Sequence, residues 1–474
     1  MRDRTRRTVR AAAAVATSVA VLLPLAVSAV ADGVRGREYW LEGYGIAEAW
    51  KSTQGEGVTV AVIDSGVDGT HPDLVGAVVG GTDASGAGDP DGQRGIGEVP
   101  GHGTLVSTLL AGRGHTDGPA PAVPEPSAGS TAKATPSAQP GPAPLSQYGR
   151  GPDGIVGVAP KADLLAVSVW IEGQSSGPNP AGIAVEEQVP DAVHWAVDNG
   201  ADVINMSLGS TSTAWPESWD EAFLYAEEND VVIVAAAGNR AGGLAQVGAP
   251  ATIPGVLAVA GLDRSGVASA EASSEGISIA VAAPSENLVG GMPGGSYAEW
   301  SGTSGAAPLV SGVAALIRSR YPDLSAAQVV NRIIGTATDA GAPGFDTLYG
   351  YGVLNVAAAV GENMTVPEQN RLGSMGEWVQ LYRRGGQSPA PAPTPSSQPP
   401  AEVIPAPPAP QAEDPLTSVN NLPAVVVLGF GGLMLAMLVG GALHVARVRR
   451  RPPESRVDTG RTERVQGEGD EHGP

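Results

Sequence analysis

Short apolar runs rich in β-branched residues alternate with longer helix-like stretches between residues 57 and 360, and this alternation most constrains the fold. The apolar runs cover residues 58–63, 162–169, 201–205 and 231–236. Such apolar runs are typical of strands that are buried on both faces, because helices cover both sides of a parallel sheet. The helix-like stretches cover residues 103–111, 186–199, 219–229 and 304–320. We therefore expect a three-layer α/β fold with a mainly parallel sheet.

A further helix start is predicted at Ser325. Gln328 follows three residues later, and a serine and a glutamine at this spacing can form a capping box at a helix N-terminus.

Composition excludes several classes of function. The chain has 28 Lys and Arg against 49 Asp and Glu, a formal net charge of −21, and phosphate binding requires a basic face. We therefore expect no nucleic-acid partner. The chain also has no cysteine, which excludes disulfides, thiolate catalysis and cysteine-based metal centres.

The first 31 residues predict an export signal. A start rich in arginine precedes an apolar run over residues 11–27, and Ala29-Val30-Ala31 fits the small-residue pattern of a cleavage site. We expect the exported chain to begin at Asp32.

An apolar stretch near the carboxyl end predicts a transmembrane helix over residues 422–446. Residues 424–445 alone would span roughly 30 Å of hydrocarbon at about 1.5 Å per residue. Arginines follow at once, so the positive-inside rule makes residues 447–474 a cytoplasmic tail. The expected location is the cell membrane, with a single pass and the preceding domain outside the cytoplasm.

Composition also divides the part between the two ends. Residues 32–56 contain several aromatic side chains and are expected to wrap onto the domain formed by residues 57–360. Within that domain, residues 113–152 predict a disordered Pro/Ala-rich insertion, either a tolerated surface loop or a gate near the site. Residues 361–421 predict a Pro-rich spacer.

Three segments far apart in the sequence carry the residues needed for acyl transfer. Asp64 follows an apolar strand, His102 opens a helix between two glycines, and Ser304 lies at a predicted helix N-terminus. A carboxylate orients a base, the base activates a hydroxyl, and the hydroxyl attacks a carbonyl. Their order along the chain, Asp, His and Ser, is one of the known orders of such a triad.

Together the segments Val60–Gly66, Gly101–Thr104 and Ser301–Pro308 resemble those of the subtilisin-like serine peptidases. The resemblance implies a subtilisin-like fold. It also implies that Asp64 orients, His102 acts as acid and base, and Ser304 attacks.

Further segments support the resemblance and imply further roles. Ala237-Gly238-Asn239 implies that the Asn239 side chain donates to the oxyanion. Ser207, Leu208 and Gly209 imply a substrate-binding edge. The chain departs from the pattern at Gly305, where many relatives carry methionine.

Other acidic and histidine residues receive structural interpretations. Asp68 and Asp73 are expected in turns or on the surface, and His71 in a structural turn. The acidic residues are scattered, so we expect no metal site and no cofactor.

The ends of the chain, together with the protease segments, resemble the mycosins, membrane-anchored subtilases associated with type VII (ESX) secretion. The expected function is a serine endopeptidase that cleaves exported proteins, with protein or peptide substrates and type VII membrane components as partners. Two alternatives remain open. The protein could stabilise a secretion complex with dispensable proteolysis, or it could be a general degradative surface protease.

Overall fold

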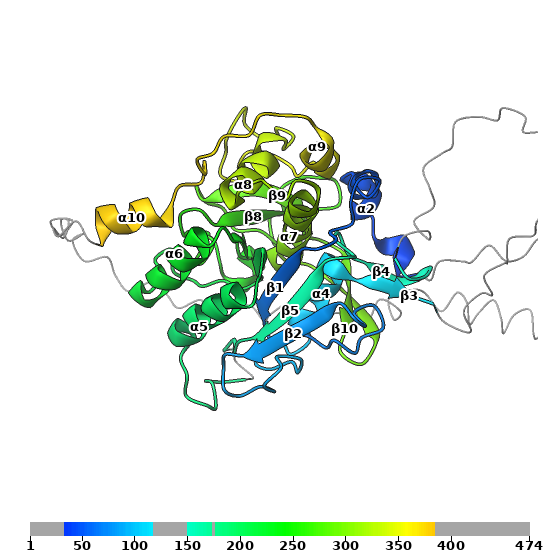
Figure 1. Cartoon of the computed structure of the whole chain (residues 1–474), viewed down its shortest axis with the longest axis vertical. Coiled ribbons are helices and arrows are strands. Elements are labelled where there is room, and N and C mark those ends of the chain that lie inside the picture. Colours follow the sequence, from blue (N-terminus) through cyan, green and yellow to red (C-terminus); the bar gives the residue numbers. More distant parts are fainter. Residues whose placement is uncertain (1–32, 117–148, 173–175, 384–474) are drawn as a thin grey trace, which may run out of the picture. The chain divides into compact units, whose positions relative to one another are not determined.

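A parallel sheet of seven strands forms the centre of the computed structural model, which describes residues 33–116, 149–172 and 176–383. The strand order is β2-β5-β1-β6-β7-β8-β9, and β1, β5 and β2 are seen side by side in Figure 1. The strands are β1 (Thr59–Asp64), β2 (Val78–Asp83), β5 (Asp163–Ser168), β6 (Val203–Met206), β7 (Val232–Ala236), β8 (Leu257–Leu262) and β9 (Ile279–Pro284). The order reverses at β1, the type of position where α/β folds place their sites.

Apart from the edge strand β2, the strands of the sheet are buried along almost their whole length because both faces of the sheet are covered. In β1, Val60 and Val62 join one core cluster, whereas Ala61 and Ile63 join the other. All four side chains are fully buried. The period of two along a strand thus divides each apolar run between two cores.

Helices cover the sheet on both sides, which confirms the predicted three-layer α/β fold. One core cluster is formed with α4 (His102–Ala111), α7 (Thr303–Arg320), α8 (Ala326–Gly335) and α9 (Val356–Gly361). The other is formed with α5 (Val185–Asp198), α6 (Asp220–Glu228) and α10 (Met375–Tyr382), which lie on one side of the strands in Figure 1. The predicted capping box at Ser325 and Gln328 is confirmed.

Two antiparallel hairpins extend the domain. Strands β10 (Leu288–Met292) and β11 (Ser296–Trp300) pair with each other, and Gly291 N–H of β10 donates to Thr108 Oγ1 of α4 over 2.9 Å. The second pair of strands corrects the first boundary of the disordered insertion predicted at residues 113–152. Its first residues form β3 (Arg113–His115), which pairs with β4 (Asp153–Val156). Residues 117–148 lie outside the described part of the chain.

The segment before β1 packs onto the domain through its aromatic residues and one ion pair. It forms η1 (Arg35–Arg37), α2 (Trp40–Gly43) and α3 (Ile46–Ala49). Trp40 and Trp50 belong to the core, and Trp50 Nε1 donates to Val158 O over 2.7 Å. Arg35 and Glu38 form a fully buried ion pair with 3.1 Å between Nε and Oε2. These residues are therefore part of the folded body.

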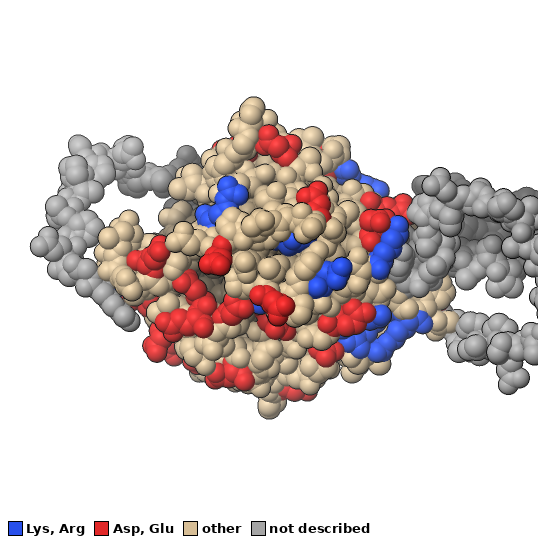
Figure 2. All heavy atoms as spheres, turned by 45° about the horizontal axis from the view of Figure 1, so that its top comes forward, with Lys and Arg blue, Asp and Glu red and all other residues tan. Residues whose placement is uncertain are grey.

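In Figure 2, acidic side chains gather on the lower left of the folded body, whereas basic side chains are more frequent on its right. This distribution agrees with the negative charge of the whole chain. Short helical turns at η3 (Glu217–Trp219) and η4 (Arg240–Gly242) complete the described elements.

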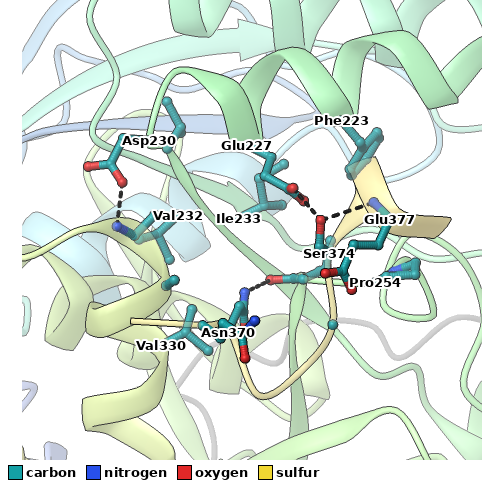
Figure 3. A pocket seen from close by; sticks show the side chains of 17 residues that line it. Phe223, Glu227, Asp230, Val232, Ile233, Pro254, Val330, Asn370, Ser374 and Glu377 are labelled. Carbon is teal, nitrogen blue, oxygen red and sulfur yellow. Dashed lines mark hydrogen bonds between the residues drawn. The ribbon is translucent and has the colours of Figure 1, made fainter. Parts of the chain in front are cut away.

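The predicted spacer over residues 361–421 differs from the structure in its first part. Residues 361–383 are folded, and α10 packs beside α6. Glu227 of α6 accepts a hydrogen bond from Ser374 Oγ over 2.6 Å (Figure 3). It accepts another from Met375 N, also over 2.6 Å. Any spacer therefore starts after this helix, because buried apolar side chains and a helix cap fix the segment to the body.

Several predictions fall on residues outside the described part. These are the export signal over residues 1–31, the transmembrane helix over residues 422–446 and the tail over residues 447–474. Within residues 33–116, 149–172 and 176–383, no helix combines the length and apolar character needed to cross a bilayer.

Candidate active site

The predicted site residues gather where parallel strands end and two helices begin. Asp64 is the last residue of β1, and Ser207 directly follows β6. Asn239 lies three residues after β7. His102 is the first residue of α4, and Ser304 is the second residue of α7. Because β1, β6 and β7 are parallel neighbours, their carboxyl ends share one edge of the sheet.

Asp64 and His102 are in direct contact. Asp64 Oδ1 lies 2.7 Å from His102 Nδ1 and also accepts from Ser65 N–H over 2.7 Å. The Asp64 side chain is fully buried, whereas 18% of the His102 side chain is exposed. A buried carboxylate at Nδ1 favours the tautomer with its proton on Nδ1, so Nε2 remains free to accept a proton.

The start of α4 is fixed by the residue next to Asp64. Gly103 N–H donates to Ser65 Oγ over 3.1 Å, which satisfies one of the unpaired N–H groups of the first helical turn. Two consecutive residues at the end of β1 thus hold the His102 ring and the backbone beside it. The position of the His102 ring and the start of α4 are therefore both fixed by the end of β1.

The charge of Asp64 controls the protonation of His102. Burial alone would lower the pKa of His102, but the negative charge of Asp64 and their hydrogen bond raise the pKa above its usual value. A histidine with a raised pKa is a stronger base at the moment when it accepts a proton.

Ser304 is held against the segment that follows β6. Ser304 Oγ donates to Ser207 O over 3.2 Å, and Ser207 Oγ donates to Ser304 O over 2.9 Å. The hydrogen bonds of the described residues do not include one between Ser304 and His102. Such bonds are often absent or long before substrate binds. Helices α4 and α7 pack against each other, and Trp300, which precedes α7, also meets His102 edge-on with 5.6 Å between the ring centroids.

Asn239 caps α7 with its oxygen and presents its nitrogen. Thr303 N–H and Thr303 Oγ1 donate to Asn239 Oδ1 over 2.8 and 3.0 Å. These two hydrogen bonds fix the orientation of the Asn239 amide. Its Nδ2 has no hydrogen-bond partner among the described residues. A Cβ at Gly302 would lie 3.1 Å from Nδ2, so a glycine there keeps the approach to the donor open. The arrangement suits donation to a negatively charged oxygen.

The segment after β6 offers free backbone groups. Gly209 is exposed, and a Cβ there would meet no atom within 4 Å. Leu208 and Gly209 make no backbone hydrogen bonds within the described part of the chain. Such an edge can pair with an extended peptide. Ser207 differs from its neighbours, because its hydroxyl is buried and already bonded to Ser304 O.

A buried polar chain behind Ser207 was not found from the sequence. Ser311 Oγ of α7 donates to Asn205 Oδ1 over 2.8 Å, and Asn205 Nδ2 donates to Ser207 Oγ over 2.9 Å. The chain links the interior of α7 to the end of β6 and so fixes Ser207 relative to Ser304. Asn205 lies two residues before Ser207, and its position inside an apolar strand was the available signal.

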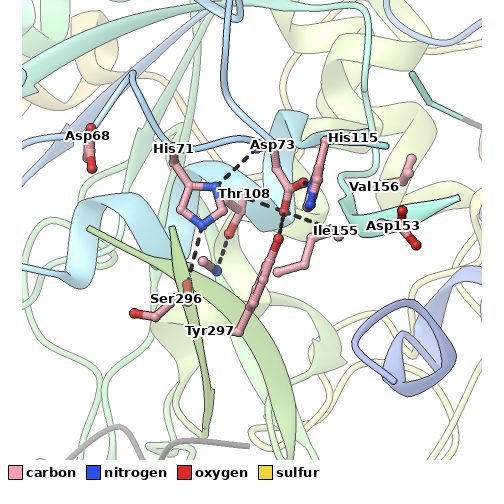
Figure 4. Close-up of polar contacts among 12 residues, drawn as sticks. Asp68, His71, Asp73, Thr108, His115, Asp153, Ile155, Val156, Ser296 and Tyr297 are labelled. Atoms are coloured by element: carbon pink, nitrogen blue, oxygen red, sulfur yellow. Dashed lines mark hydrogen bonds and ion pairs between the residues drawn. The ribbon is translucent and has the colours of Figure 1, made fainter. Parts of the chain in front are cut away.

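Asp73 lies in a turn, which was one of the two expectations for it, but it is not on the surface. Its side chain is fully buried, and its carboxylate accepts from His115 Nδ1 over 2.6 Å and from Tyr297 OH over 2.9 Å (Figure 4). Ile155 N–H donates a third hydrogen bond over 2.8 Å. A carboxylate directly after a His-Pro turn is buried here because β3, β4 and β11 supply donors from distant parts of the chain.

His71 lies in the turn that was expected for it. Asp73 N–H donates to His71 Nδ1 over 3.1 Å, so Nδ1 carries no proton, and Nε2 lies 3.3 Å from Ser296 O (Figure 4). Burial lowers the pKa of His71 and outweighs the opposite effect of the Asp73 charge. These contacts are those of a structural histidine.

The pocket drawn in Figure 3 does not coincide with the predicted site. The pocket in Figure 3, of about 310 Å³, lies between α6, α8 and the segment leading to α10, and none of the predicted site residues lines it. Among the described residues, no group of three or more His, Cys, Asp or Glu side chains is placed to hold a metal ion.

The sequence of the folded part matches one protein family. Residues 55–352 match the family described as the Subtilase family, Peptidase S8. The chain is 35% identical to Subtilisin DY of Bacillus licheniformis over 310 residues, which covers 65% of this chain and 92% of that protein.

Solved structures of MycP1 and MycP3 are also similar. MycP1 from Mycobacterium smegmatis has a TM-score of 0.52 at 29% identity, covering 70% of this chain and 86% of that chain. The MycP3 protease from the type VII (ESX-3) secretion system has a TM-score of 0.50 at 31% identity, covering 69% of this chain and 88% of that chain.

Proposed function

Because the chain belongs to the subtilase family and is a subtilisin-like serine peptidase, we propose that Asp64, His102 and Ser304 are its catalytic triad. The observation that carries this proposal is the 2.7 Å contact between Asp64 Oδ1 and His102 Nδ1, at the edge of the sheet where α7 presents Ser304. A buried carboxylate, an oriented imidazole and a hydroxyl at a helix N-terminus are the parts that peptide-bond cleavage by a serine nucleophile requires.

The first half of the reaction makes an acyl-enzyme. His102 Nε2 takes the proton from Ser304 Oγ as the oxygen attacks the carbonyl carbon of the scissile bond. Asp64 stabilises the resulting imidazolium through Nδ1. Asn239 Nδ2 and the Ser304 N–H, one of the unpaired N–H groups of the first turn of α7, donate to the oxyanion. His102 then gives its proton to the leaving amine.

The second half releases the acyl group. A water molecule takes the place of the amine, His102 removes its proton, and the resulting hydroxide attacks the acyl carbon. The proton returns to Ser304 Oγ as the acid product leaves. The same base and the same two oxyanion donors therefore serve both halves.

We propose that substrates bind as extended strands along residues 207–209. The free backbone groups of Leu208 and Gly209 support this, since a strand added at an edge gains main-chain hydrogen bonds. Such binding favours unfolded segments and exposed loops of proteins over compact domains.

We also propose that the protease acts on exported proteins at the membrane, in connection with type VII secretion. The predicted export signal, the apolar stretch over residues 422–446 and the similarity to MycP1 and MycP3 support this context. The orientation follows from the arginines after that stretch, which favour a cytoplasmic tail.

Two assays with the full-length chain test these proposals. Detergent-solubilised wild-type protein should cleave unfolded casein, and Ser304→Ala should lose this activity while keeping its thermal melting temperature. In a deletion strain, Ser304→Ala at normal protein levels should fail to restore secretion. Restored secretion would instead favour the alternative that the protein stabilises the secretion complex without proteolysis. Unchanged secretion after deletion, with active casein cleavage, would favour a general degradative protease.

A further inference from the structure

We propose that Trp300 is a positioning residue that fixes the His102 ring relative to Ser304, an inference that rests on the proposed triad. Trp300 is the last residue of β11 and lies four residues before Ser304. Its ring meets the His102 ring edge-on, at 5.6 Å between centroids and an interplanar angle of 77°. One side chain thus belongs to the segment of the nucleophile and contacts the base.

Two glycines make the space that holds the indole. A Cβ at Gly290 of β10 would lie 2.9 Å from Trp300 Nε1, and a Cβ at Gly305 of α7 would lie 3.3 Å from Trp300 Cζ2. Trp300 pairs with Leu288 in the register of the hairpin. The ring therefore lies in a slot between the hairpin, α7 and His102, and only 9% of the residue is exposed.

The slot also explains the departure of the sequence at Gly305. A Cβ there would approach Leu288 Cδ1 to 2.3 Å, in addition to its contact with Trp300. A side chain after Ser304 would therefore require Leu288 of the hairpin to shift. The hairpin occupies the space that a larger residue would need.

The indole N–H does not hold Trp300 in the slot by a hydrogen bond. Trp300 Nε1 is buried and has no hydrogen-bond partner among the described residues. What the residue supplies is a flat, rigid shape, which phenylalanine largely reproduces. A shape-based role therefore predicts that Phe replaces Trp300 well and that Ala does not.

The need for such a residue follows from the contacts of His102. Asp64 holds the ring at one atom, Nδ1, and Ser304 Oγ is bonded to Ser207 O instead of Nε2. A ring held at one atom can still swing. Contact with Trp300 on another side restricts that motion, so Nε2 is already in place when the Ser304 hydroxyl turns toward it. Misplacement of a reacting group by about 1 Å can cost about 10²-fold in rate.

The test compares Trp300→Ala and Trp300→Phe with a matched tryptophan. Trp219 is 4% exposed, also has a buried Nε1 without a partner, and packs in the cluster on the opposite face of the sheet. In the full-length protein, Trp300→Ala should lower kcat on a peptide amide by about 10²-fold with KM nearly unchanged. Trp300→Phe should retain kcat within about three-fold. Trp219→Ala should lose thermal stability yet keep kcat.

Other outcomes would overturn the inference. Unchanged kcat in Trp300→Ala, an equal loss in Trp300→Phe, or a loss in Trp219→Ala as large as that in Trp300→Ala would each contradict a positioning role. If Trp300→Ala does not fold, Trp300→Leu gives the same comparison.

A second measurement separates this inference from the proposed function, because it needs no turnover. In the Ser304→Ala background, the His102 ring should give one sharp set of nuclear magnetic resonance signals. Adding Trp300→Ala should broaden or split these signals, as the ring then samples several orientations. Sharp, single signals in both proteins would overturn the inference even if the peptidase is active.

Discussion

Asp64 and His102, which are 38 positions apart in the sequence, are joined by a contact of 2.7 Å between Oδ1 and Nδ1. The contact places a fully buried carboxylate at one nitrogen of a partly exposed imidazole. It sets both the tautomer and the proton affinity of the ring, and so the pH at which the proposed triad should work depends on the local structure at the end of β1.

The pH dependence of activity should show this link. His102 must be neutral to accept the Ser304 proton, and its pKa is raised above the ordinary 6.5. The acid limb of kcat/KM should therefore have its midpoint above about 6.5. Asp64→Asn should move this midpoint down and lower kcat by about 10⁴-fold. A wild-type midpoint below that of Asp64→Asn would contradict the assignment.

The oxyanion role of Asn239 can be separated from its capping role. Asn239→Asp keeps an oxygen for Thr303 N–H but removes the amide donor and adds a negative charge. It should lower kcat by at least about 10²–10³-fold with little change in KM. Thermal stability should remain near that of the wild type. Asn229→Ala, a change at the C-terminal end of α6 far from the site, is the control and should leave kcat unchanged. Retained kcat in Asn239→Asp would exclude the amide as an oxyanion donor.

The space around Gly305 predicts an unusual response to alanine. Alanine normally stabilises a helix by about 1 kcal/mol relative to glycine. Here its Cβ would lie 2.3 Å from Leu288 Cδ1, so the clash should dominate and destabilise the protein by about 1–3 kcal/mol. Gly361→Ala in α9, where a Cβ would meet nothing within 4 Å, is the matched control and should be neutral or stabilising. Denaturant unfolding of both variants gives the comparison.

The buried turn at His71 predicts a loss of stability in acid. Burial lowers the pKa of His71 in the folded protein, so the unfolded chain binds this proton more readily. The free energy of unfolding should therefore fall as the pH drops below about 6.5, the ordinary value for histidine. His102 affects the free energy of unfolding in the opposite direction, because its pKa is raised in the folded protein. Its stabilising contribution is lost as the pH rises through that raised pKa. The quantity to measure is therefore the free energy of unfolding of the wild type minus that of His71→Asn. This difference should become smaller toward acid pH. A constant difference between pH 7 and pH 5 would contradict this account.

Much of the fold was predictable because its signals are local. The strands predicted at residues 58–63, 162–169, 201–205 and 231–236 correspond to β1, β5, β6 and β7 with shifts of one or two residues at their ends. Apolar runs and helix caps arise from neighbouring residues, so they can be read without knowing the tertiary structure.

The strands that were missed have weaker patterns. β2 contains Gly80 and Gly81 and exposes Val79, and glycine weakens the pattern of a strand. β8 and β9 are rich in alanine, which does not distinguish a strand from a buried helix. α10 was missed because its segment lies beside a Pro-rich stretch, although Met375 and Val379 are buried.

The parts of the site that were missed depend on distant partners. Asp73 is buried because His115 and Tyr297 reach it from 42 and 224 positions away. Trp300 also meets His102 from a distant part of the sequence. No local sequence pattern indicates the contacts of Asp73 or that of Trp300. The residues of the proposed triad could be named from the sequence because each lies in a short motif of neighbouring residues.

The most direct test of the triad is the site of covalent labelling by a fluorophosphonate. The wild-type protein should form an adduct that mass spectrometry maps to Ser304. Ser304→Ala should remain unlabelled, and His102→Ala should label at least about 10³-fold more slowly, since the hydroxyl is weak without its base. An adduct on another serine, or labelling of Ser304→Ala at the wild-type rate, would contradict the account.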